Sequence, residues 1–206
     1  WIYLVSIGAS LIIVFLFSQD FLANLAWRRY GLADIALALV RNRADLAMQL
    51  GNHYFNGGKY DPKKAQRAYK KALRAEPDPL WTNYQLARIY FVEGYNTKAL
   101  EYINKELEIY PENLRSLYVR GLIFGYQKNY VKAEEDFRNF VSWSPKEWAG
   151  YNDLSWILSK RGKHREAKET IEAALHEIPS EAEKNPWLWN SLGVAELNLR
   201  NYSEAR

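Results

Sequence analysis

The chain has 206 residues, a formal net charge of +4 and no cysteine. The lack of cysteine excludes disulfide bonds and thiolate metal sites. The charge excess is small and acidic residues are mixed among the basic ones, whereas a nucleic-acid binder gathers Lys and Arg on one face. The composition therefore argues against a nucleic-acid partner. Aromatic residues make up 15% of the chain, a high share that the rest of the sequence must explain.

The first segment, residues 1–19, contains no charged residue. A helix of this length spans roughly 28 Å at ~1.5 Å per residue, close to the ~30 Å hydrocarbon core of a bilayer. Apolar side chains occupy every face of such a helix instead of one stripe. The segment therefore predicts an N-terminal transmembrane helix that anchors the chain in a membrane. A buried core helix is the alternative interpretation.

Basic residues that follow this segment set its expected orientation. Positive charge close to a span favours the cytoplasmic side of a membrane. Four arginines lie within the relevant distance: Arg28, Arg29, Arg41 and Arg43. We therefore expect one span in this sequence and a cytoplasmic domain after it. If other spans precede residue 1, the segment would be the last helix of a polytopic protein.

Residues 20–43 form a linker that reads as helix with a break near Gly31. Five apolar residues follow the i, i+3, i+4, i+7, i+8 spacing of one helix face: Leu32, Ile35, Ala36, Leu39 and Val40. In arrays of repeats the terminal unit needs a cap over its exposed face. We expect this linker to be a capping helix that uses the apolar stripe for that purpose.

Proline and alanine recur every 34 residues through the rest of the chain. The residues in question are Pro77, Pro111, Pro145 and Pro179, with Ala65, Ala99, Ala133 and Ala167. Two residue types that share such a period indicate repeated supersecondary units. The pattern predicts an array over residues 44–206. Its repeats are expected at 44–79, 80–113, 114–147, 148–181 and 186–206, the last of them truncated.

Each repeat resembles the tetratricopeptide repeat (TPR), a helix–turn–helix unit. In that family a small residue on the first helix, helix A, lets it pack closely on the second, helix B, which carries Ala and ends near Pro. The first repeat matches with Leu50, Gly51, Tyr54, Ala65, Tyr69, Ala72 and Pro77, and the third with Gly121, Phe124, Ala133, Phe137 and Pro145. The resemblance implies an all-α fold, a right-handed superhelical solenoid of such repeats.

The sequence offers no arrangement of residues that would carry catalysis. The three histidines are His53, His164 and His176, and none has a second ligand at metal-binding spacing. The Gly57–Gly58 pair lacks the Gly-Lys-Ser pattern of a phosphate loop and is explained as a helix–helix turn. We therefore predict no cofactor, no metal and no enzymatic activity for this part of the protein.

The resemblance places a binding groove on the concave face, which helices A line at helical spacing. Carried onto this sequence, the groove residues are Asn52, Trp81, Tyr84, Arg88, Arg115, Tyr118, Tyr126, Asn152, Trp156 and Asn190. Tyr, Trp and Arg often carry the binding energy of interfaces. The basic residues favour an acidic segment or a C-terminal carboxylate as the ligand. The implied partner is a protein or peptide, although Trp81 could instead pack against the adjacent repeat.

Three functions are compatible with these features. The leading hypothesis is a membrane-anchored scaffold or adaptor that binds partner proteins in the helix-A groove. The alternative is the C-terminal TPR tail of a polytopic membrane enzyme, of the envelope glycan polymerase or ligase type, whose catalytic part precedes residue 1. The third is an architectural role through self-association of the repeats.

Overall fold

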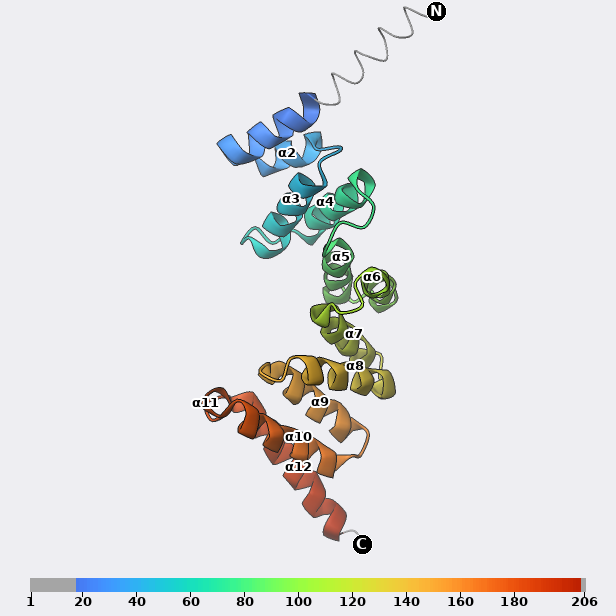
Figure 1. Cartoon of the computed structure of the whole chain (residues 1–206), viewed down its shortest axis with the longest axis vertical. Coiled ribbons are helices and arrows are strands. Elements are labelled where there is room, and N and C mark those ends of the chain that lie inside the picture. Colours follow the sequence, from blue (N-terminus) through green and yellow to red (C-terminus); the bar gives the residue numbers. More distant parts are fainter. Residues whose placement is uncertain (1–17, 205–206) are drawn as a thin grey trace, which may run out of the picture. The chain divides into compact units, whose positions relative to one another are not determined.

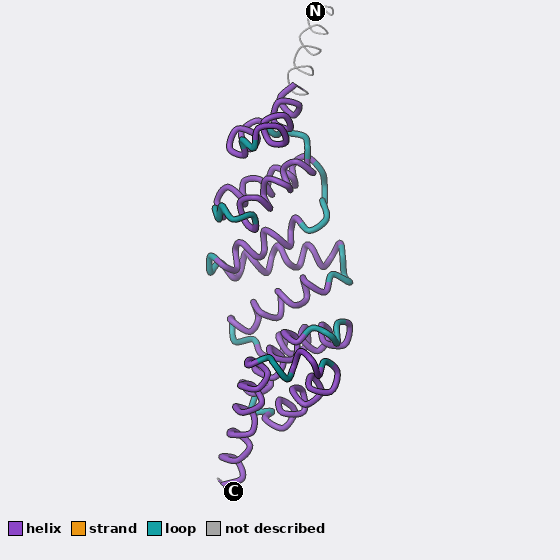
Figure 2. The backbone as a smooth tube through the Cα atoms, turned by 90° about the vertical axis from the view of Figure 1, so that its left-hand side faces the viewer, coloured by secondary structure: helices purple, strands orange, loops and turns teal. Residues whose placement is uncertain are grey.

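The computed structural model describes residues 18–204, and the predicted membrane segment at 1–19 lies outside this range except for its last two residues. Every regular element of the described part is a helix, and Figure 2 shows the helices joined by short loops. None of these helices is long and apolar enough to cross a membrane. The all-α, TPR-like solenoid fold expected from the sequence is confirmed for the described residues.

The chain forms two compact parts that divide after Glu93, here called the N-terminal half and the C-terminal half. The N-terminal half holds helical residues 18–30 and then α2 (Ala33–Leu39), α3 (Ala44–Asn56), α4 (Pro62–Ala75) and α5 (Thr82–Val92). The C-terminal half holds α6 (Asn96–Ile109), α7 (Leu114–Tyr126), α8 (Tyr130–Trp143), α9 (Trp148–Lys160), α10 (His164–Glu177), α11 (Pro179–Ala182) and α12 (Pro186–Glu204) (Figure 1). The division falls inside the predicted repeat 80–113, and the repeat boundaries stay a prediction.

The linker is broken at Gly31, whose φ of +64° suits a residue without Cβ. Leu32 becomes the N-cap of α2 instead of part of its face. The buried side of α2 is then formed by Ala33, Ala36 and Leu37, while Leu32 and Ile35 are 46% and 49% exposed. The predicted apolar stripe is therefore wrong for these two residues, because the break shifts the phase of the helix.

The linker is fastened to the first repeat by polar contacts. The Lys71 ammonium on α4 donates to the main-chain oxygens of Leu37 at 2.7 Å and Val40 at 2.8 Å. A cation at this place satisfies carbonyl groups that the end of α2 leaves without partners. At the other end of the linker, the Asp20 carboxylate accepts from the main-chain N–H of Arg41 at 2.7 Å.

The hairpin of α3 and α4 shows how the repeated small residue works. A Cβ at position 51 would lie 2.4 Å from Cε1 of Tyr69, so only glycine allows the two helices to approach this closely. The Tyr69 ring is fully buried, and its hydroxyl donates to Asn52 Oδ1 at 2.8 Å. Asp61 starts α4 by accepting from the Lys64 main-chain N–H at 3.0 Å, with Pro62 at the first helical position.

The same packing recurs in the C-terminal half between α7 and α8. There a Cβ at Gly121 would lie 3.0 Å from the ring of the buried Phe137. Phe137 belongs to a core cluster that includes Ile157 of α9 and Ala195 of α12. Helices α9, α10 and α12 lie side by side (Figure 1). This packing fixes the relative positions of the helix-A side chains on α7, α9 and α12.

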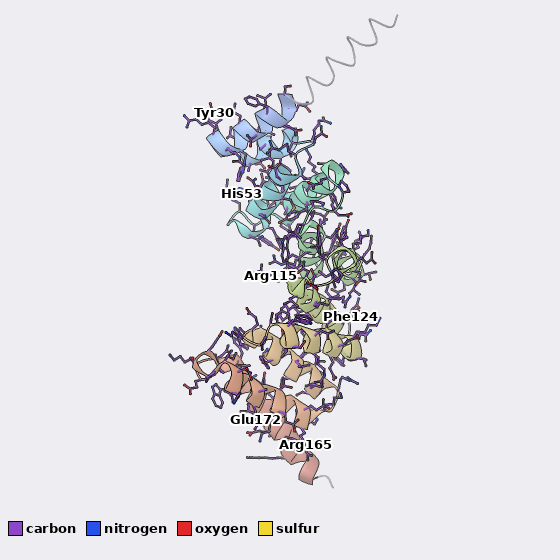
Figure 3. The ribbon with its side chains drawn as sticks, in the orientation of Figure 1. Tyr30, His53, Arg115, Phe124, Arg165 and Glu172 are labelled. Carbon is purple, nitrogen blue, oxygen red and sulfur yellow. The ribbon has the colours of Figure 1, made fainter. Side chains whose placement is uncertain are left out.

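Helix α12 differs from the other helices A because it continues without a turn to Glu204. Space over Gly193, its small residue, is open: apart from its chain neighbours and the backbone of its own helix, no described atom lies within 4 Å of a Cβ placed there. Lys168 of α10 connects α10 with α12 by pairing with Glu196 at 3.3 Å, and it also pairs with Glu172 of its own helix at 3.6 Å. Glu172 is marked on α10 in Figure 3.

Candidate functional site

The C-terminal half contains a pocket of about 650 Å³ between α7, α8, α9 and α12, here called the C-terminal pocket. This volume lies in the range of roughly 300–1,000 Å³ typical of ligand sites. Its lining residues are Leu122, Gly125, Tyr126, Lys128, Tyr130, Phe137, Asn152, Asp153, Trp156, Lys160, Trp187, Asn190 and Ser191. The lining combines apolar and aromatic side chains with several polar and charged groups.

Four of the groove residues predicted from the sequence line this pocket: Tyr126, Asn152, Trp156 and Asn190. They come from α7, α9 and α12, which are the helices A of three successive predicted repeats. Tyr126 is 71% exposed and Trp156 is 43% exposed, so both rings offer apolar surface to solvent. The fold therefore brings these four predicted residues, which are far apart in the sequence, to the lining of one pocket.

The Trp156 ring forms the centre of the aromatic wall. It lies against α7 at Gly125, where a Cβ would come within 3.2 Å of the indole. The Tyr130 ring meets it edge-on with centroids 6.3 Å apart, and the Lys160 ammonium lies 5.8 Å from the centroid. Such arrangements of aromatic pairs and of cations over rings are favourable. Tyr130 was missed by the sequence analysis because it lies on helix B, outside the predicted stripe.

Several polar groups of the C-terminal pocket form hydrogen bonds around Asp153. Its Oδ2 accepts from the Tyr118 hydroxyl at 2.6 Å and its Oδ1 from Asn152 Nδ2 at 3.0 Å. Asn152 Oδ1 in turn accepts from the Ser191 hydroxyl at 2.8 Å. Burial raises the pKa of Asp153, and the two hydrogen bonds oppose that rise only in part. Burial, with the nearby carboxylate, also raises the pKa of Tyr118.

Tyr118 therefore has a different position from the four pocket residues. Its ring packs against Phe137 and Phe140, with centroid distances of 5.7 and 5.0 Å. Its hydroxyl orients Asp153, so Tyr118 holds a lining residue in place without lining the pocket itself. Arg115, one turn earlier on α7, is exposed and is not among the lining residues (Figure 3).

In the N-terminal half the predicted groove residues contact one another. Tyr84 is only 9% exposed, and the Trp81 ring meets it edge-on at 5.4 Å. Trp81 has a φ of +70°, an unusual backbone conformation for a residue with a side chain. The Arg88 guanidinium lies over the rings of Phe55 at 5.0 Å and Tyr84 at 5.6 Å.

Asn52, the remaining predicted residue, is exposed but already accepts the Tyr69 hydroxyl bond at its side-chain oxygen. Its side chain thereby holds the ring that fills the space over Gly51. The predicted groove residues of this half are therefore engaged in contacts within the half.

A second pocket of about 500 Å³ lies in the N-terminal half, beside α2. There Asp34 accepts from the Tyr54 hydroxyl at 2.6 Å and pairs with Lys64 at 2.7 Å. The hydrogen bonds from Lys64 and Tyr54 lower the pKa of Asp34. His53, marked in Figure 3, packs edge-on against Trp27. Because its charges pair with one another, this pocket indicates no particular ligand.

Residues 18–204 contain no cluster of three His, Asp or Glu side chains that could hold a metal ion.

Comparisons with known proteins relate the chain to repeat proteins. Residues 82–113 and 149–179 match the family model of the tetratricopeptide repeat. The chain is 34% identical to a TPR repeat-containing protein of Methanocaldococcus jannaschii over 118 residues, which are 56% of this chain and 20% of that protein. It is 26% identical to a protein O-mannosyl-transferase of Homo sapiens over 136 residues, 61% of this chain and 15% of that protein.

A crystal structure of a protein named MamA has the same fold. It superposes with a TM-score of 0.66 at 20% identity, over 76% of this chain and 95% of that chain. The chain thus spans only a fifth or less of the two sequence relatives but most of this structural neighbour. Tetratricopeptide repeats are generally non-catalytic scaffolds for protein–protein interaction, in agreement with the absence of enzymatic activity predicted above.

Proposed function

Because the chain contains tetratricopeptide repeats, we propose that it is an interaction scaffold that holds a segment of a partner protein in the C-terminal pocket. The observation that carries the proposal is that Tyr126, Asn152, Trp156 and Asn190, predicted from the sequence as groove residues, line one open pocket. Open aromatic side chains beside amide groups suit a peptide, since rings bind apolar side chains and amides bind the main chain.

The charges at the pocket support an acidic partner segment. Lys128 and Lys160 are exposed cations on the lining. Asp153 is the acidic residue of the lining, and Tyr118 and Asn152 already donate to its carboxylate. Acidic groups of a ligand would therefore meet these two exposed lysines, an arrangement that also speeds association.

A membrane tether at residues 1–19 is the second part of the proposal. It rests on the uncharged sequence of that segment, with arginines after it that favour a cytoplasmic scaffold. Fusing residues 1–30 to a fluorescent protein tests this part. We expect the fusion to remain in membranes after alkaline carbonate washing. Its full release into the wash would contradict the membrane tether.

Selection from a phage-displayed random peptide library, with the full chain as bait in mild detergent, tests the binding site. Trp156→Ala should remove most of the selected binding, because the variant loses the aromatic wall. Trp143→Ala is the matched control, since Trp143 is also in the C-terminal half, is 72% exposed and lies outside the pocket. Circular dichroism must show equal helicity for both variants. Equal binding by both variants would exclude the pocket as the site.

The enzyme-tail alternative is favoured by one observation, the match to the O-mannosyl-transferase. Under this alternative the repeats would position a substrate protein for a catalytic part ahead of residue 1. The encoded sequence ahead of residue 1 decides between the two: several further apolar spans would favour the enzyme, and a short leader would favour the free-standing scaffold. Light scattering on the purified chain tests self-association.

A further inference from the structure

The carboxylate of Asp153 is the unusual group in the C-terminal pocket. It lies on α9 between the Tyr118 hydroxyl of α7 and the amide of Asn152, which donate to its two oxygens. A carboxylate can accept about four hydrogen bonds, so these two donors leave acceptor capacity free. Because Asp153 lines the pocket, a ligand can reach that remaining capacity.

Two buried carboxylates in the C-terminal half, Glu134 and Asp136, have cationic partners, whereas the buried Glu106 accepts from Asn113 Nδ2 at 3.2 Å. Glu134 pairs with Arg138 at 2.8 Å, Lys163 at 3.0 Å and also Arg161. Asp136 receives two bonds from the Arg120 guanidinium, at 2.7 and 2.9 Å.

Asp153 has hydrogen-bond donors but no cation among the described residues. Burial raises its pKa, and no lysine or arginine contributes to lowering it. Asp153 is half-buried, and a carboxylate partly withdrawn from water carries a desolvation cost that an incoming cation would offset. The partner that the Asp153 carboxylate lacks is therefore a positive charge.

The exposed lysines of the lining have the opposite preference. Lys128 and Lys160 are exposed, and the Lys160 ammonium already lies over the Trp156 ring. A uniformly basic segment would be repelled by these lysines, whereas a uniformly acidic one would place a like charge near Asp153. Only a segment with both signs of charge in the right order complements the lining.

We propose that the C-terminal pocket binds a partner segment in which one Lys or Arg side chain pairs with Asp153 and the residues on either side of it are acidic and meet Lys128 and Lys160. The proposal rests on the proposed function and adds the charge pattern of the ligand. Asp153 is then the residue that determines specificity, and Tyr118 is a positioning residue that orients the carboxylate.

Three pools of synthetic peptides, equal in length and with the same mixture of apolar and aromatic residues, test this pattern. The first pool has a central Lys between acidic residues, and the second has norleucine in place of that Lys. The third reverses all charges, with a central Glu between lysines. The full chain is immobilised, and the retained fraction of each pool is measured by mass spectrometry.

The wild-type chain should retain the Lys-centred pool about tenfold better than the norleucine pool, a difference of about 1.4 kcal/mol, and should retain the reversed pool least. In Asp153→Asn this ratio should fall to about one, while both pools are still retained on the intact aromatic wall. The double variant Lys128→Gln with Lys160→Gln should lose the preference for acidic flanks and keep the preference for the central Lys.

The inference is overturned if Asp153→Asn keeps the tenfold preference or if the reversed pool binds best. It is also overturned, with the proposed function intact, if wild type retains all pools equally and Trp156→Ala releases them. If no pool is retained above the Trp156→Ala background, both proposals fail. A melting curve for Asp153→Asn no lower than that of wild type separates lost recognition from lost folding.

Discussion

The helix-A stripes of the two halves have similar residues in very different surroundings. In the N-terminal half, Tyr84 is buried and carries Arg88 on its ring, so these side chains stabilise the fold. In the C-terminal half, Tyr126 and Trp156 remain open around a pocket. A stripe position thus indicates the face of a helix, while the neighbouring side chains decide whether that face is buried or exposed to solvent.

The largest expected effect compares Tyr84→Ala with Tyr126→Ala. Removal of the buried Tyr84 ring should cost about 3 kcal/mol of unfolding free energy through lost burial and a cavity. Tyr126→Ala should stay within about 0.5 kcal/mol of wild type, because its ring is exposed. Urea unfolding followed by circular dichroism measures both values. Similar costs for the two tyrosines would remove the difference between the halves.

The second comparison uses two glycines at the same repeat position. Gly51→Ala places a methyl group against the buried Tyr69 ring, which Asn52 holds by a hydrogen bond, and should destabilise by about 1–3 kcal/mol. Gly193→Ala meets open space in a helix and should stabilise by about 0.5–1 kcal/mol. Thermal unfolding should show a lower melting temperature than wild type for Gly51→Ala and a higher one for Gly193→Ala. A lower melting temperature for both variants would contradict the open space over Gly193 on α12.

The third comparison is between Glu134, a carboxylate paired with cations, and Asp153, a carboxylate without one. Burial by itself would raise the pKa of Glu134, but hydrogen bonds from Arg138, Lys163 and Arg161 outweigh it and hold the pKa below its ordinary value of 4.5. Because the folded pKa is depressed, the stabilisation is present above pH 4.5 and is lost as the pH falls through the folded pKa. Glu134→Gln should therefore cost about 1–2 kcal/mol at neutral pH, since its partners are partly exposed. Denaturant melts from neutral to acid pH should show this cost disappearing.

The smallest effect is expected for Asp153→Asn. Burial raises the folded pKa of Asp153, so its ionised form opposes folding, and wild type gains stability as the pH falls through that pKa. The variant removes the charge and keeps an oxygen that can accept from Tyr118. Its unfolding midpoint at neutral pH should equal or exceed that of wild type. A clearly lower midpoint would show that the carboxylate stabilises the fold instead of serving a ligand.

Much of the fold could be predicted from the spacing of small and large residues. The pattern of Gly51 with Tyr69, and of Gly121 with Phe137, indicated helix pairs in close contact, and the structure contains both contacts. The phase of α2 could not be predicted, since it depends on the backbone turn at Gly31.

The candidate site was predictable only in part. The resemblance to the tetratricopeptide repeat pointed to Tyr126, Asn152, Trp156 and Asn190, but it did not point to Tyr130 or Asp153. Tyr130 comes from helix B, and the importance of Asp153 depends on the absence of a cation nearby, which is a property of three-dimensional packing. For the same reason the sequence did not reveal that Tyr84 is buried.

Site-specific photo-crosslinking tests most directly whether the C-terminal pocket holds the partner. Benzoylphenylalanine replaces Tyr126 in one variant, Trp143 in a second and Phe55 in a third, and each is irradiated with the tightest peptide from the library selection. We expect a crosslink from position 126 and none from positions 143 and 55. Crosslinking from position 55 or 143 with none from position 126 would contradict it.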